Sequence, residues 1–534
     1  MSANHPTSTN DPPWTEPGAD AADLRRLGRQ VVPRLPLAFL IVAALCSVFI
    51  AFHVGSIVVQ SFADTRVMHE YLEGAALLSV DASRDGWSVM YPPDFADPDT
   101  RLIITPYPPL FHVMWRGTAW LMQDATYAPG RIVALVALGV VMFCTFKIAR
   151  LVGVGRLAAS VFSLCLLMPI PVSRWVGVAR VDFPALAFAF LGLWLYLRFK
   201  ERPGLAYLWC VVPFIMTGLT KQSVIAAPAA VVLTELAERR VRRAFVLGIA
   251  TVVPILVVFL SLNWTTDGGF FDATVRSLAD EIFLHLGAAM ALDLFLSNPV
   301  PLGLALLALV PWVLRDFTHR TLLLYAGTSM VILILTIGKP GSNVNYYIEP
   351  VAALCVAGSA GLACLERKSW RCHMTAVCAL TACIVWAATL VVPPLEAFSE
   401  YKATQLNGPR TIELPEDPMN RAVLAPSPYV LLFEPRRTYY LNDDFTFSAL
   451  AAWDKLLPAE RITADLRSQR IGAVLVHQNV LAAGRPEPRF IGDWQGGWNF
   501  WSVAAFREAL FDAYAPVDVR LPHQLLLFLP IERR

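Results

Sequence analysis

The sequence predicts a polytopic α-helical membrane protein with about eleven transmembrane helices, additional juxtamembrane helices, and a small C-terminal α/β domain outside the membrane. Of its 534 residues, 56% are hydrophobic and only 16% are charged, and the mean hydropathy is +0.51. Apolar runs of roughly 16–25 residues recur through the first three quarters of the chain, each bounded by Arg or Lys. Such runs match helices that cross a hydrocarbon core about 30 Å thick. A soluble globular protein carries more charge and fewer apolar runs of this length.

The N-terminal segment 1–35 is rich in proline and polar residues, and we expect a disordered cytoplasmic tail. It ends in Arg25, Arg26, Arg29 and Arg34, directly before the first apolar run. No clear cleavage site follows, so residues 36–60 are interpreted as a retained signal anchor.

The expected spans are 36–60, 131–151, 157–172, 184–199, 205–220, 222–237, 244–262, 297–314, 321–338, 350–366 and 372–392. One further apolar segment, 107–122, is short and contains Pro108, Pro109, His112 and Arg116. If this segment does not cross, every second loop is basic, as the positive-inside rule requires. We therefore expect a juxtamembrane helix there, a cytoplasmic N-terminus and an extracytoplasmic C-terminal domain.

This topology collects the long polar segments on the external side of the membrane: 61–130, 173–183, 263–296, 339–349 and the tail 393–534, together with the tight turn at Lys221. Residues 36–392 then form the transmembrane domain, and we expect function to lie on its external face, which includes the large loop 61–130. Apolar spacing within 65–79 predicts an amphipathic helix on the membrane, with His69, Glu70 and Glu73 on its wetter side. The tail mixes short β-like runs at 429–434, 471–477 and 524–530 with helical stretches at 447–469 and 502–513.

Two acids stand at the external ends of predicted spans. Asp64 follows the first span by about four residues and could be an ordinary loop carboxylate. Asp182 stands at the mouth of the span that begins at Pro184, where it could serve as the helix N-cap. A carboxylate at this depth is costly and usually has a partner or a task, and the two roles of Asp182 are compatible.

Cations and amides accompany these acids on the same predicted side. Arg180 precedes Asp182, and Lys221 lies between two apolar runs, where it suits a phosphate or simply snorkels to the interface. The loop "GKPGSNVNYYIEP" contributes Lys339, Asn345, Tyr346 and Tyr347. These residues suit a hydroxyl-rich or phosphorylated ligand; an aromatic interfacial belt would explain the tyrosines but not the asparagines.

Several other kinds of chemistry find no support in the sequence. It has no P-loop, no GxGxxG after a strand, no HExxH and no Cys/His metal cluster, and it offers no surface for nucleic acid. The nine cysteines lie between Cys46 and Cys383, in or beside spans, and are read as apolar filler. No cofactor is implied; two carboxylates could hold a divalent metal ion, but nothing in the sequence requires one.

The chain resembles the GT-C superfamily of integral-membrane glycosyltransferases, and most of all family 39, which includes protein O-mannosyltransferases and the aminoarabinose transferase of lipid A. The resemblance covers roughly residues 36–365. It rests on an acid just after the first span, "LEG", "PPL", "GRIVALVALG", "ARVDFPALAF", "GLTKQS" and "NVNYYIEP", in that order. The chain departs from the family at Thr65, where a second acid often follows the first, and at Tyr107, where His commonly precedes the Pro-Pro pair.

The resemblance implies an inverting glycosyltransferase, either a hexosyl- or a pentosyltransferase, with a polyprenyl-phosphate-linked sugar donor. The acceptor would be an envelope glycan, lipid or protein on the external face of a cell membrane, the bacterial inner membrane by this reading. In this comparison Asp64 is the catalytic base, and Asp182 orients the acceptor or a basic partner. The donor phosphate is assigned to Lys221, Arg180 and Lys339. Contacts with the substrates are assigned to Asn345, Tyr346, Tyr347 and Glu70.

Two other functions remain compatible with the sequence. A transporter or flippase of lipid-linked sugars would be expected to show two related halves with interrupted helices at mid-membrane. The sequence has no internal repeat, and its polar groups gather on one face instead. A structural membrane scaffold is the third alternative.

Overall fold

The computed structural model describes residues 34–63, 65–66, 72–97, 99–279, 282–339, 342–406, 421–424, 440–441, 458–477, 504–517 and 525–531. The predicted disordered tail, apart from its last residues, lies outside these ranges. Asp64 and Glu70 lie outside them as well.

The described chain forms a bundle of apolar helices. Seven are long and apolar enough to cross a membrane: α2 (Arg34–Ala63), α6 (Ala128–Leu151), α9 (Asp182–Phe199), α12 (Val241–Thr265), α16 (Arg320–Ile337), α17 (Ile348–Lys368) and α18 (Trp370–Leu406). An eighth candidate is the pair α14 (Leu284–Ser297) and α15 (Pro299–Val313), which is bent by 102°. Three shorter apolar helices complete the bundle: α7 with η1 (Arg156–Leu167), η2 with α10 (Ala206–Thr220) and α11 (Ala226–Ala237). These segments match the eleven predicted spans with one difference: α14 lies almost wholly in 263–296, which was predicted as an external segment, and only α15 corresponds to the predicted span 297–314. The predicted fold class is confirmed.

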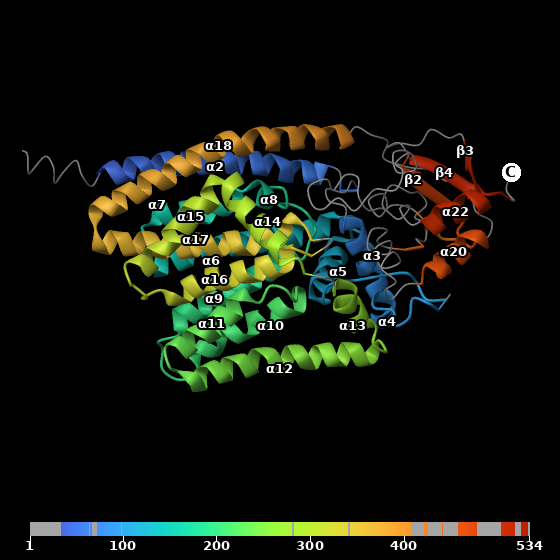
Figure 1. Cartoon of the computed structure of the whole chain (residues 1–534), viewed down its shortest axis with the longest axis horizontal. Coiled ribbons are helices and arrows are strands. Elements are labelled where there is room, and N and C mark those ends of the chain that lie inside the picture. The colour runs from blue at the N-terminus through green and yellow to red at the C-terminus, as the bar shows by residue number, and fades with distance from the viewer. Residues whose placement is uncertain are drawn as a thin grey trace, which may run out of the picture.

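Helix α17 is the centre of the bundle, because its sequence is rich in small residues. In its most apolar stretch, 94% of the residues are buried. A Cβ added at Gly361 would lie 1.9 Å from the carbonyl oxygen of Leu307, and one at Gly358 would lie 3.2 Å from that of Leu304. The two glycines therefore let α15 approach the backbone of α17, the packing mode that small residues allow between membrane helices. At the periphery, α2 and α18 run side by side along one edge of the molecule, and α12 runs along the opposite edge (Figure 1).

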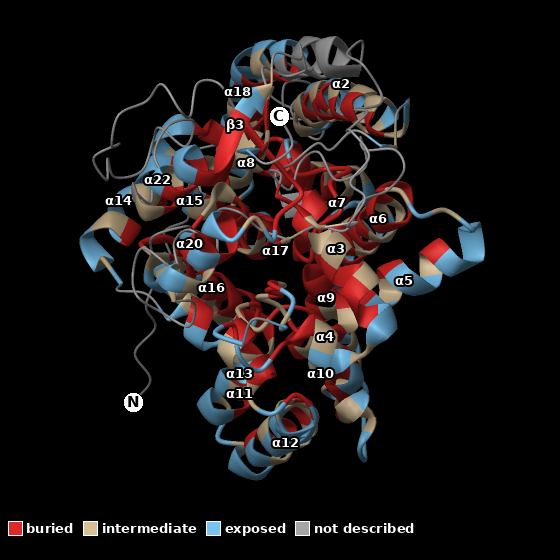
Figure 2. Cartoon of the chain, turned by 90° about the vertical axis from the view of Figure 1, so that its right-hand side faces the viewer, coloured by how far each residue is buried: buried red, intermediate tan, exposed pale blue. Residues whose placement is uncertain are grey.

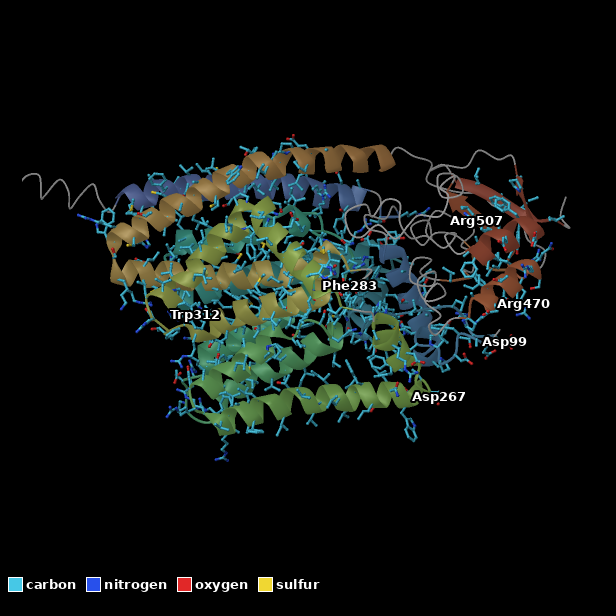
Figure 3. All side chains as sticks on the ribbon, in the orientation of Figure 1. Asp99, Asp267, Phe283, Trp312, Arg470 and Arg507 are labelled. Carbon is cyan, nitrogen blue, oxygen red and sulfur yellow. The ribbon has the colours of Figure 1, made fainter. Side chains whose placement is uncertain are left out.

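The polar loops gather at one end of the bundle, which we call the loop end. It contains the short helices α3 (Leu72–Asp85), α4 (Trp87–Met90), α5 (Leu110–Met122), α8 (Ile170–Ser173), α13 (Gly269–Thr274), η3 (Arg276–Leu278) and η4 (Val344–Tyr347). Asp99, Asp267, Arg470 and Arg507 lie toward this end, whereas Trp312 lies in the half of the bundle farther from the sheet (Figure 3). The gathering of these segments at one end agrees with the topology expected from the basic loops.

Helix α5 has the amphipathic character expected of a juxtamembrane helix. It buries Phe111, His112 and Trp115, while Trp120 and Leu121 are 77% and 75% exposed. Figure 2, viewed from the loop end, shows buried residues around α3, α9 and α17 and exposed residues at the rim of the molecule, on α5 and α12.

The C-terminal domain is a small α/β unit that rests on the first loop. Its four-stranded sheet has the order β1-β2-β4-β3, formed by β1 (Val423–Leu424), β2 (Ala473–His477), β3 (Tyr514–Val517) and β4 (Leu525–Pro530). Strand β1 runs parallel to β2, and the other two pairings are antiparallel. Helices α20 (Ala459–Arg467) and α22 (Ala504–Ala513) pack against each other.

The predicted strands at 471–477 and 524–530 are present, and the run at 429–434 lies outside the described residues. One boundary differs from the prediction: α18 continues through Pro393 and Pro394 to Leu406, so the last apolar helix extends into the predicted domain. A single apolar core joins Ile462 and Phe506 of this domain to Met90 and Ile104 of the first loop. Arg461 adds a bond of 2.6 Å to the carbonyl of Thr100.

Candidate functional site

The centre of the site is a buried ion pair between the N-terminus of α9 and the turn after α10 (Val211–Thr220). Lys221 donates from Nζ to Oδ1 of Asp182 at 2.6 Å, and both side chains are 4% exposed. Asn345, on η4, donates to the same oxygen at 2.8 Å. The N-cap alternative for Asp182 is wrong: Val181 occupies the N-cap position, and no side chain caps the helix. The carboxylate instead joins three loop-end segments that are far apart in the sequence.

A second cation and three aromatic rings surround this pair. The Nε atom of Arg180 lies 3.7 Å from Oδ2 of Asp182, and its guanidinium lies 5.0 Å from the centre of the Trp175 ring. The ammonium of Lys221 lies 4.9 Å from the ring centre of Tyr346 and 5.9 Å from that of Tyr107. Aromatic faces attract cations at such distances. The rings therefore hold two positive charges beside a single carboxylate.

The local charge makes this cluster suited to an anion. Burial alone would lower the pKa of Lys221, but the adjacent Asp182 carboxylate outweighs it, so the pKa of this lysine is raised above its usual value. Lys221 is therefore charged at every physiological pH. With Arg180 it places two cations beside the Asp182 carboxylate, and adjacent buried cations favour phosphate or a developing oxyanion. Glu349, the second acid of the site, accepts a 3.4 Å hydrogen bond from the hydroxyl of Tyr325.

A cavity opens beside the ion pair between α9, the turn after α10, α16, η4 and the start of α17. The space that it encloses is small, about 30 Å³. Asp182, Lys221, Asn345, Tyr346 and Glu349 line it together with Ser223 and apolar residues such as Leu333. A lining that combines polar and apolar side chains is typical of a site for an amphiphilic ligand.

The structure does not bring every predicted residue to this cluster. Lys339 donates to the carbonyl oxygen of Leu278 at 3.4 Å, and Tyr347 donates to the carbonyl oxygen of Met290 at 2.8 Å. Neither is among the described residues that line the cavity. Asp64 and Glu70, the remaining predicted site residues, lie outside the described part of the chain.

A second buried ion pair lies at the same end and was not expected. Glu73 of α3 is completely buried, so its predicted position on the wet side of a surface helix is wrong. Helix α3 spans Leu72–Asp85 rather than 65–79, and Glu73 lies on the buried face, where it pairs with Arg131 of α6 at 2.9 Å. The sequence did contain an indication of this pair. Arg131 is a charged residue at the start of an otherwise apolar span, and such residues usually have a buried partner.

Two aromatic residues of the cluster, Tyr107 and Trp175, were not predicted as site residues. Tyr107 was noted only as a departure from a family pattern, yet its hydroxyl lies 3.5 Å from Arg180. Tyr107 is held in place because its carbonyl accepts a 2.8 Å bond from the hydroxyl of Tyr91. Within the described residues, no group of three or more His, Cys, Asp or Glu side chains could hold a metal ion.

Comparison with known proteins relates the chain by structure rather than by sequence. No family model matches it, and no curated protein matches it in sequence. ArnT from Cupriavidus metallidurans in the apo state aligns with 90% of this chain and 97% of its own, at 13% identity and a TM-score of 0.54.

The same protein bound to undecaprenyl phosphate aligns over the same shares, at 12% identity and a TM-score of 0.55. The oligosaccharyltransferase of Archaeoglobus fulgidus, in complex with Zn and sulfate, aligns with 82% of this chain and 67% of its own, at 13% identity and a TM-score of 0.48. The likeness to ArnT extends over nearly the whole of both chains, so this protein has the GT-C fold that its sequence motifs led us to expect.

Proposed function

We propose that the protein is an inverting glycosyltransferase that moves a sugar from a polyprenyl-phosphate donor to an envelope acceptor at the membrane surface. The observation that carries this proposal is the buried Asp182–Lys221 pair, with Arg180 beside it, at the cavity in the loop end. Support also comes from the shared fold with ArnT, which was solved with undecaprenyl phosphate bound. The loop end is then the extracytoplasmic side, and the N-terminus is cytoplasmic.

The cations have a clear task in this reaction. The acceptor hydroxyl attacks the anomeric carbon of the donor sugar, and the bond from that carbon to the phosphate oxygen breaks. The electron pair of that bond leaves with the lipid phosphate, where negative charge increases in the transition state. Lys221 and Arg180 would stabilise that charge, because both are buried cations beside Asp182.

The proposal gives the two acids different roles. Asp64 takes the proton of the attacking hydroxyl as general base. Asp182 is the counter-ion that orients Lys221 and Asn345 toward the cavity. Tyr346 and Asn345 line the cavity and would contact donor or acceptor. We assign the phosphate contacts to Lys221 and Arg180 rather than to Lys339, whose ammonium is directed to a backbone carbonyl.

The decisive experiment is transfer of a radiolabelled sugar from a polyprenyl-phosphate donor by the purified protein in lipid vesicles. Wild type should form a glycosidic bond, and Asp64→Asn should lose transfer by a factor of about 10² to 10⁴, the range for a general base. Asp85→Asn serves as the matched control, because Asp85 is an exposed residue of the first loop that pairs with Arg101.

Two results would revise the proposal at different levels. Full transfer by Asp64→Asn would reject Asp64 as the base and leave glycosyl transfer in place. Movement of the lipid-linked sugar across the vesicle membrane without glycoside formation would identify the protein as a transporter of such lipids instead.

A further inference from the structure

We propose that Glu73 and Arg131 are a positioning pair, which holds the backbone that carries Arg180 and Asp182 in its working place. This inference rests on the proposed function and adds two residues that act on the site from outside it. Neither residue lines the cavity, so their effect reaches the reaction only through the groups that they hold.

The pair is completely enclosed. The Nε atom of Arg131 donates to Oε1 of Glu73 at 3.1 Å, and NH2 donates to Oε2 at 2.9 Å. Both side chains are 0% exposed. A bidentate arrangement fixes the relative orientation of two groups as well as their distance. Helix α3 is thereby locked to the first turn of α6.

Glu73 extends this lock to the second loop. Its Oε1 atom also accepts the backbone N–H of Ala179 at 2.7 Å, and Ala179 is fully buried. The next residue along the chain is Arg180, and Asp182 follows two positions later. A single carboxylate oxygen therefore fixes the backbone from which the second cation of the site and its counter-ion project.

The start of α6 holds the end of the first span in the same way. Arg131 donates from NH1 to the carbonyl oxygen of Ser61, and the N–H of Tyr127 donates to the carbonyl oxygen of Thr65 at 3.1 Å. The guanidinium of Arg131 lies 5.2 Å from the centre of the Tyr127 ring. The first turn of α6 is thus the common support of the first and the second loop.

Packing beside the pair leaves no freedom for the second loop to shift inward. A Cβ added at Gly130 would lie 2.8 Å from the Cβ of Ala179 and 2.6 Å from the ring of Trp115. Gly130 is therefore a contact surface for Ala179, and the neighbouring Arg131 supplies the hydrogen-bonded link through Glu73. The absence of a side chain at Gly130 and the ion pair of Arg131 with Glu73 therefore both fix the position of Ala179.

The positioning role of this pair differs from a contribution to stability alone. A buried ion pair can often be replaced by apolar residues of similar volume without loss of stability. Apolar residues cannot offer an acceptor to the N–H of Ala179, so that bond is the feature that only a polar residue at position 73 provides. Shifts of about 1 Å in a reacting group can lower a rate about 100-fold.

The test compares two double variants of the full-length protein in the sugar-transfer assay. Glu73→Gln with Arg131→Gln removes both charges but keeps an amide oxygen to accept the Ala179 N–H. Glu73→Leu with Arg131→Met fills the same space and removes the acceptor. We expect kcat within about threefold of wild type for the first pair. For the second pair we expect kcat to fall about tenfold to 100-fold, although the protein unfolds at a similar temperature.

The outcomes separate this inference from the proposed function. A wild type that forms no glycoside refutes the function itself. If wild type transfers sugar and the folded Leu/Met variant has an equal kcat, the positioning role is wrong. A folded Gln/Gln variant that is as inactive as the Leu/Met variant would also overturn it, because the acceptor would then not be the deciding feature.

A second comparison needs no change of charge and decides the matter if the Leu/Met variant fails to fold. Gly130→Ala pushes on Ala179 as well as on the ring of Trp115 and should lower kcat more than it raises KM for the donor. Gly139→Ala, in the same helix, is the matched control because a Cβ there meets nothing within 4 Å. Equal kcat values for these two variants would contradict the proposal.

Discussion

The loop end contains two buried ion pairs, each between a carboxylate and a basic side chain. They differ in whether a cavity lies beside them. Glu73–Arg131 is sealed from solvent, and both carboxylate oxygens accept bonds from the guanidinium. Asp182–Lys221 borders a cavity, and within the described residues Oδ2 of Asp182 accepts no hydrogen bond. The ammonium of Lys221 has three N–H donors, and Asp182 accepts a hydrogen bond from one of them. The sealed pair is complete without a ligand, whereas the cavity pair keeps capacity for one.

The largest effect should come from removing one member of the sealed pair. Arg131→Met alone leaves the Glu73 carboxylate buried without its partner, and we expect a loss of about 3–5 kcal/mol in the free energy of unfolding. Unfolding of the purified protein in detergent measures this loss. The control is Arg240→Met at the opposite end of the bundle. Arg240 lies 3.3 Å from both Glu201 and Glu238 but is 34% exposed, so its loss should cost less than about 1 kcal/mol. Similar losses of stability in the two variants would contradict the expected difference between a sealed ion pair and a partly exposed one.

The cavity pair should respond in the opposite manner, with activity affected more than stability. Lys221→Met removes a charge-stabilising donor, and we expect transfer to fall by a factor of about 10² to 10³. Stability should fall less than in Arg131→Met, because Asp182 keeps Asn345 at 2.8 Å and Arg180 at 3.7 Å. Initial rates of transfer and unfolding temperatures of the same preparation check both parts. If the variant loses stability in proportion to activity, Lys221 supports the fold and has no separate role in the reaction.

The sequence predicted the bundle well, because membrane helices have a strong and local signal. Runs such as 36–60 and 321–338 are predominantly apolar and contain no charged residue apart from His53 when protonated, and basic loops alternate between such runs, so length and charge were sufficient. The alternation of basic loops also predicted that the ambiguous segment 107–122 forms a juxtamembrane helix, and α5 has the amphipathic burial expected of one. Residues 471–477 and 524–530 were predicted as strands from their apolar, β-branched or leucine-rich runs.

The site could be predicted only in part, since its geometry depends on contacts between distant segments. Asp182, Arg180, Lys221, Asn345 and Tyr346 do meet, as their shared side of the membrane suggested. Glu73 was assigned to the wet face because apolar spacing over 65–79 placed it there. Its burial depends on Arg131, 58 residues away. Tyr347 and Lys339 show the converse limit: a loop can be placed correctly while single side chains turn toward neighbouring backbone carbonyls.

A pH series would test why Lys221 is charged. The pKa of Lys221 is raised, so the charged form and its contribution are fully present below the unfolded value of about 10.4 and are lost only as pH rises through the still higher folded value. Donor binding by wild type should therefore not decline between about pH 7 and pH 10 through this residue.

Asp182→Asn sharpens that test, because the variant removes the carboxylate that raises the pKa while the burial that lowers it remains. We expect an alkaline decline in binding of a polyprenyl phosphate to appear below pH 10 in this variant, measured by titration at several pH values. Asn345→Ala is the matched control, since it removes a hydrogen bond to Asp182 but no charge. The same flat profile in both variants would show that Asp182 does not control the charge of Lys221.

The smallest effect is expected at Lys339, and it tests how far the cluster extends. Its ammonium is a cation at the loop end, as the sequence suggested, but it donates to the Leu278 carbonyl at 3.4 Å and does not line the cavity. A single hydrogen bond to a carbonyl contributes about 1 kcal/mol, and salt screens the effect of a distant charge on the donor phosphate. Lys339→Met should therefore change KM for the donor by less than about threefold and leave kcat unaltered, in contrast to Lys221→Met. A loss of transfer comparable to that of Lys221→Met would mean that Lys339 leaves the Leu278 carbonyl for the donor phosphate, and the cation site would then have three members rather than two.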